Sequence, residues 1–102
     1  MDSAKFDIEK FTSKNDFRLW RMKMRALLVH HGLEQALEGE KGLPTTMSER
    51  EKKKVLNKAH SALILSFGDK VLREVSKEKS TVTIWNKLEN LYMTKSLAIG
   101  YT

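Results

Sequence analysis

Apolar residues recur along this chain at the spacing of α-helices, in three long amphipathic segments. At 100° per residue, the apolar positions of the first segment fall within one sector about 100° wide, as a core-facing stripe should. The second segment follows Ser48, and the third follows Ser80 or Thr81. We expect the core to be built from these stripes, through Phe17, Trp20, Met24, Leu28, Leu63, Phe67, Trp85, Leu88 and Tyr92.

Polar residues mark where these helices begin. Ser13 and Asp16 have the spacing of a capping box before the first helix, and Asn15 is a rival cap. Ser48 and Glu51 have the same spacing before the second helix. We therefore expect the first helix to start near residue 15 and the second just after Ser48.

The remaining segments predict shorter elements. LEQALEG predicts a helical turn or two, EKGLPTTM a loop, and DKVLREV a short helix. No segment has the alternation of a strand, so the fold class predicted is all-α, a compact bundle of about five helices. We place this helical domain at residues 15–94, after an extended N-terminal arm at 1–14 and before a frayed or truncated tail at 95–102.

The chain is basic, with a formal net charge of +6 and a pI near 9.7. Such a surplus attracts polyanions such as RNA, although a solvated basic face is the simpler interpretation. Two clusters are candidate contacts for RNA or for another subunit. Their members are Arg18, Arg21 and Arg25 beside the first stripe, and Lys52, Lys53 and Lys54 in the second helix.

Several function classes lack support in the sequence. There is no Cys, there is no nucleophile motif, and the three His have no ligand spacing, so we predict no enzyme, no metal, no cofactor and no small-molecule substrate. The start has no signal-peptide character, and the longest uncharged run, AHSALILSFG, is too short to cross a membrane. We expect a cytoplasmic protein, with the nucleus as the alternative, and no membrane partner.

The residues also resemble a known family. KFD followed by FRLWRMKMRALLVHHGLEQALEG is similar to the opening of the Gag region of plant copia-type LTR retrotransposons, where a KFDG-type arm precedes W-x-x-x-M-x-x-x-L and G-L-x-x-x-L-E-G. AHSALILSFGDKVLREVSKEKSTVTIWNKLENLYMTKSLA resembles the next section, with D-x-V-L-x-x-V and W-x-K-L-E-x-L-Y. The matches run in order over about residues 5 to 98.

The resemblance implies the N-terminal part of a capsid-like Gag domain, which is helical, self-associates and takes part in packaging the element's RNA. Three departures qualify it. Ile8 stands where the family has Gly, the long basic helix expected after SLA is replaced by IGYT, and the Cys-containing zinc knuckle is missing. These departures suggest a truncated or decayed copy.

The leading hypothesis is therefore a non-catalytic structural module of a retrotransposon Gag that associates with itself or with related Gag chains. One alternative is a small basic protein that binds RNA nonspecifically through electrostatics. Another is a domesticated or decayed fragment that interferes with assembly of intact Gag. Patterning finds the core and not the interface, so it does not assign self-association to a particular surface.

Overall fold

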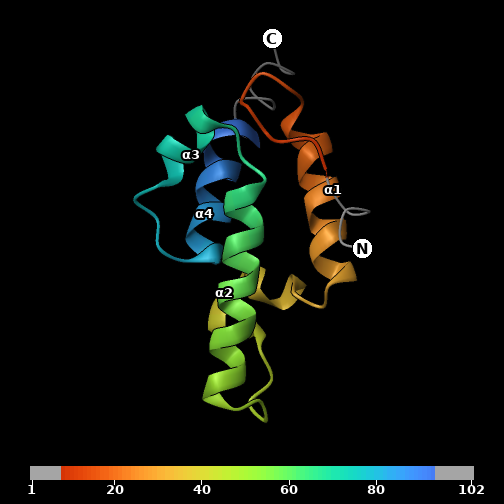
Figure 1. Cartoon of the computed structure of the whole chain (residues 1–102), viewed down its shortest axis with the longest axis vertical. Helices are drawn as coiled ribbons and strands as arrows, with labels where there is room; N and C mark the ends of the chain where they lie inside the picture. The colour runs from red at the N-terminus through yellow and green to blue at the C-terminus, as the bar shows by residue number, and fades with distance from the viewer. Residues whose placement is uncertain (1–7, 94–102) are drawn as a thin grey trace.

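A computed structural model gives the structure of the chain, and it describes residues 8–93. The elements are α1 (Phe17–His30), the 3₁₀ segment η2 (Glu34–Gly42), α2 (Glu49–Leu65), α3 (Asp69–Val75), α4 (Thr81–Leu88) and the π-helical turn η3 (Glu89–Met93). Within residues 8–93 the backbone forms no strand, only an isolated bridge. The all-α prediction is confirmed. Figure 1 shows α1 and α2 side by side, with α4 packed behind the upper half of α2.

The caps of the long helices follow from local polar residues, with one correction. Ser48 caps α2 in a complete capping box with Glu51, as predicted. At α1, however, the cap is Asp16, whose carboxylate accepts a hydrogen bond from the backbone N–H of Leu19 at 3.2 Å. The predicted pairing of Ser13 with Asp16 is wrong, because Ser13 has a φ of +77° and lies in a turn before the helix.

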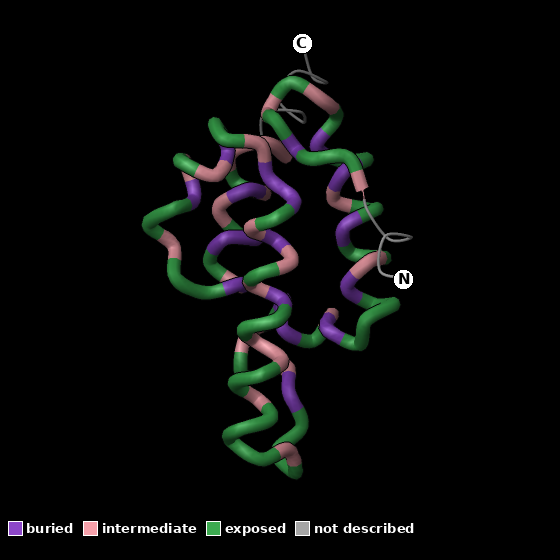
Figure 2. Tube along the Cα trace, viewed as in Figure 1, coloured by how far each residue is buried: buried purple, intermediate pink, exposed green. Residues whose placement is uncertain are grey.

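The core lies between α1, α2 and α4, where the buried positions of these helices face one another (Figure 2). Of the residues predicted to form it, all except Tyr92 are buried. Tyr92 is half-buried and packs against the core from η3. Its ring contacts Phe11 and Phe17, which belong to an aromatic cluster completed by Trp20, Phe67 and Trp85.

The segment before α1 takes part in this core. Phe11 is completely buried, and its backbone forms a parallel bridge with Phe67 at the end of α2. Two hydrogen bonds of 2.9 Å hold this bridge, from Phe11 N–H to the Ser66 carbonyl and from Gly68 N–H to the Phe11 carbonyl. The arm is therefore attached to the junction between α2 and α3.

Two segments differ from the pattern expected of them. The last helix was predicted to continue through Tyr92, but α4 ends at Leu88 and the chain continues as a π-helical turn. Helical backbone also extends further into EKGLPTTM than predicted, because η2 ends at Gly42. Gly39 interrupts η2 with a φ of +79°, a conformation that a glycine adopts without the steric cost of a side chain.

Candidate interface on helix α1

Helix α1 has an outer face as well as the stripe that faces the core. The buried residues of α1 are Phe17, Trp20, Met24 and Leu28, all in the stripe. Met22 and Val29 lie outside that stripe and are 68% and 50% exposed. The arginines at the border of the stripe lie next to these two side chains. The outer face thus combines exposed apolar side chains with positive charge.

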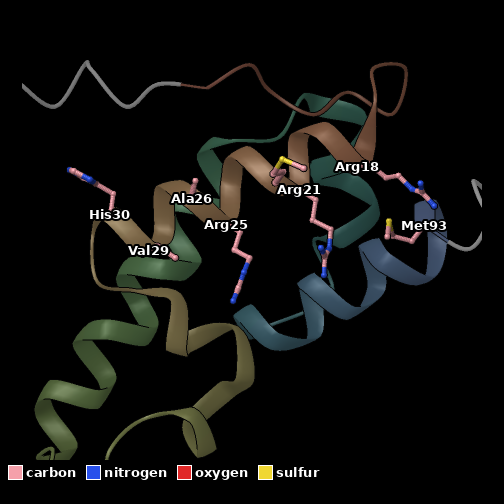
Figure 3. A pocket seen from close by; sticks show the side chains of 8 residues that line it. Arg18, Arg21, Arg25, Ala26, Val29, His30 and Met93 are labelled. Carbon is pink, nitrogen blue, oxygen red and sulfur yellow. The ribbon is translucent and has the colours of Figure 1, made fainter.

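A groove of about 670 Å³ runs along this face. Most of its lining comes from α1, and Met93 of η3 closes one end. Figure 3 shows the lining side chains projecting from α1, with Met93 facing Arg18 from the end of η3. The lining residues are Arg18, Arg21, Met22, Arg25, Ala26, Val29, His30 and Met93.

The three arginines of α1 have different surroundings. Arg21 donates from Nε to Oε2 of Glu89 at 2.8 Å, and its guanidinium also pairs with that carboxylate through Nη2. Its Cζ atom lies 5.6 Å from the centre of the Trp85 ring, within range of a cation–π contact. Arg21 therefore joins α1 to α4 and η3, while Arg18 and Arg25 are exposed along the groove.

The three lysines of α2 do not form one patch. The side chain of Lys52 is mostly covered, and its Nζ lies 3.8 Å from Oε2 of Glu49. Lys53 and Lys54 are exposed, but they line separate hollows. The groove that contains Lys54 lies between α1 and α2, whereas the hollow that contains Lys53 lies beside the start of α4.

Some residues of this region were not identified from the sequence. Met22, Val29 and Met93 line the groove, and Glu89 holds Arg21. The signal for Met22 and Val29 was available, because they are seven residues apart and share a face of the helix outside the core stripe. The contact of Arg21 with Glu89 joins positions 68 residues apart, and no local pattern predicts it.

Tyr92 holds the other side of η3. Its hydroxyl donates a hydrogen bond to the carboxylate of Glu74 in α3. Burial, together with this carboxylate, raises the pKa of the Tyr92 hydroxyl above its ordinary value. Arg21 and Tyr92 thus fix the π-helical turn from two directions, which positions Met93 at the end of the groove.

No cluster of three His, Asp or Glu side chains within residues 8–93 could hold a metal ion. None of the helices in the described part of the chain is long and apolar enough to span a bilayer. The groove on α1 combines exposed apolar side chains with positive charge, as a surface for contact with another molecule would.

Comparison with known proteins gives the context for this groove. The profile of the gag polypeptide of LTR copia-type elements matches residues 24–101. The retrovirus-related Pol polyprotein from transposon TNT 1-94 of Nicotiana tabacum is 34% identical to this chain over 97 residues. This alignment covers 95% of the chain and 7% of the polyprotein. No solved structure matches the chain.

Proposed function

Because the chain belongs to the gag-polypeptide family of LTR copia-type elements, we propose that it is a non-catalytic structural module that associates with copies of itself or with related Gag chains. The chain spans 7% of the polyprotein that it matches, so the proposal concerns the gag region alone. The gag region lies outside the enzymatic domains of such polyproteins, which supports a structural role over a catalytic one.

The observation that carries this proposal is the groove on α1. Met22 and Val29 expose apolar surface that nothing within residues 8–93 covers, and Arg18 and Arg25 border it. Methionine and arginine are both enriched in protein interfaces relative to the rest of protein surfaces. Covering the apolar side chains with a second chain would remove them from water, which is the main favourable term in association.

The proposal is tested by measuring molar mass with light scattering over a concentration series, at low and high salt and after nuclease treatment. We expect reversible oligomers that grow with concentration. Replacing Met22 and Val29 together by Asp should weaken association by about tenfold or more, since interface residues that matter cost more than 1 kcal/mol each.

The matched control is Leu65→Asp, because Leu65 is 75% exposed on α2 and lines the other groove, between α1 and α2. It should leave association unchanged. A wild-type chain that is monomeric at every concentration, with and without RNA, would contradict the proposed function. Association that Leu65→Asp weakens and the double variant does not would place the contact on α2 instead.

A second function, nonspecific RNA binding, is favoured by the net charge of +6 and by the exposure of Arg18 and Arg25 along one groove. Contacts of arginine with phosphates release counterions, so the affinity should fall steeply with salt. We expect Arg18→Glu with Arg25→Glu to abolish binding of a single-stranded RNA at low salt. Lys14→Glu with Lys23→Glu reverses the same number of charges at exposed positions outside the groove and is the matched control, and equal losses in both variants would argue against a groove-specific contact.

A further inference from the structure

The hollow that contains Lys53 is separate from the groove on α1 and lies where α4 begins. Its volume is about 540 Å³, and its walls come from η2, α2 and the segment that enters α4. In Figure 1 the start of α4 lies beside the middle of α2, close to the level at which η2 approaches α2, and both α2 and α4 contact η2. Three segments that are distant in sequence therefore enclose one space.

The first turn of α4 borders this space. The N–H of Thr83 bonds to Oγ of Ser80 at 3.3 Å, and the N–H of Ile84 bonds to the Ser80 carbonyl at 3.1 Å. The N–H groups of Thr81 and Val82 have no acceptor among the described residues, as is usual in the first turn of a helix. Both residues line the hollow, at the positive end of the helix dipole.

Two buried polar atoms, each from a residue that lines the same hollow, also have no partner within the described residues. Oγ1 of Thr81 and Nε2 of His60 are inaccessible to water, and neither has a hydrogen-bond partner among the residues described. Thr81 is only 3% exposed, and both residues line the hollow. A buried polar atom without a partner costs free energy, so native proteins pair nearly all of them. A bound group that accepts a hydrogen bond from the Thr81 hydroxyl would remove that cost.

The charges around the hollow determine what kind of group would bind. Lys53 and Lys79 reach it from α2 and from the residue before the cap of α4, and neither has an ion-pair partner within residues 8–93. Glu40 supplies the one carboxylate in the lining, and its negative charge disfavours an anion. Two ammonium groups, two backbone N–H groups and a hydroxyl form a donor set that suits an anion and would repel a metal ion.

We infer that this hollow is a binding site for a phosphate-type anion, held by Lys53, Lys79, Thr81 and the N-terminus of α4. The hollow is larger than a single phosphate needs, so a diphosphate or the terminal phosphate of a nucleic acid could enter it. This site is independent of the groove on α1, and it requires no self-association.

The test uses the whole chain labelled with ¹⁵N and titrated with inorganic pyrophosphate at low salt. We expect the amide signals of Thr81 and Val82 to shift in a saturable way. Thr81→Val should weaken binding by about tenfold, because a hydrogen bond to a charged group is lost. Glu40→Gln should strengthen binding by several-fold, because it removes a repelling charge.

A matched pair of variants distinguishes binding in this hollow from the general attraction of anions to a basic protein. Lys53→Gln and Lys54→Gln remove the same charge from adjacent positions of α2, but only Lys53 lines this hollow. We expect about a fivefold loss of affinity for Lys53→Gln and little change for Lys54→Gln. Equal losses, or the absence of saturable shifts at Thr81 and Val82, would overturn the inference.

A second arm of the experiment identifies the source of the phosphate. The same titration is repeated with an RNA hexanucleotide that carries either a 5′-phosphate or a 5′-hydroxyl. Shifts that require the 5′-phosphate and disappear in Thr81→Val would show that a nucleic acid terminus occupies the site. Shifts with pyrophosphate alone would assign it to a free anion. Thermal unfolding of each variant, unchanged within error, excludes misfolding as the cause.

Discussion

The two faces of α1 are built from similar residue types, yet one is buried in the core and the other is exposed. On the inner face Trp20, Met24 and Leu28 are buried, whereas on the outer face Met22 and Val29 remain largely exposed. Both faces contain a methionine and an aliphatic residue at helical spacing. The difference is what lies opposite. On the inner face Trp20 packs against Phe11, Phe67 and Trp85, and α1 also contacts η2 and η3, whereas nothing within residues 8–93 covers the outer face.

This comparison shows that apolar content alone does not distinguish a core position from an interface position. The inner residues contribute to stability because water has left them on folding, and the outer residues can contribute in the same way only when another molecule covers them. Arg21 lies between the two faces and is held by Glu89 and Trp85. Substitutions across α1 should therefore separate stability from association.

The largest effect is expected on the inner face, at Trp20. Trp20→Ala removes a buried ring that contacts Phe11, Phe17, Phe67 and Trp85. Such a truncation should lower the free energy of unfolding by about 3–5 kcal/mol, a large part of the total for a small domain. Urea denaturation followed by circular dichroism measures it. A loss near zero would mean that the ring is not packed as described.

An intermediate effect on stability is expected at the border between the two faces of α1, where Arg21→Ala can be compared with Arg25→Ala. Arg21→Ala removes a partly exposed ion pair and a cation–π contact, so the free energy of unfolding should fall by about 1–2 kcal/mol. Arg25 has no ion-pair partner within the described residues, and its removal should change stability by less than about 0.5 kcal/mol. Equal losses of stability in the two variants would contradict the structural role given to the contacts of Arg21.

The smallest effect on stability is expected on the outer face. Met22→Asp places a carboxylate near Arg18 and Arg25 on an exposed surface, so the free energy of unfolding should change by less than about 0.5 kcal/mol. Chemical denaturation of this variant, at a concentration where the wild type is monomeric, makes the measurement. A destabilisation of several kcal/mol would show that the outer face belongs to the core.

Much of the fold could be predicted from the sequence because it depends on local signals. The stripes of α1, α2 and α4 and the capping box at Ser48 follow from periodicity and spacing, and the resemblance to copia-type Gag regions is confirmed by the family match. The early end of α4 could not be predicted in this way. The π-helical turn that follows is held by tertiary contacts, from Arg21 of α1 to Glu89 and from Tyr92 to Glu74 of α3, and local patterning does not include such contacts.

The candidate site was predicted less completely for a similar reason. Composition identified the arginines, but grouping them as one cluster missed the contact of Arg21 with Glu89. The lysines at 52–54 were adjacent in sequence, and the helix directs them to different surroundings. The hollow at the start of α4 combines residues from three elements. No local pattern joins Lys53, His60 and Thr81 before the chain is folded.

The attachment of Phe11 to Phe67 has a practical consequence for anyone who shortens this chain. The family profile begins at Met24, so a fragment cut to the matched residues would lack Phe11, Phe17 and Trp20. That deletion would remove half of the aromatic cluster and leave Phe67 and Trp85 facing water. Such a fragment would aggregate through its opened core, and its aggregation could be mistaken for assembly. Deletions from the N-terminus should therefore leave Phe11 and the residues after it in place.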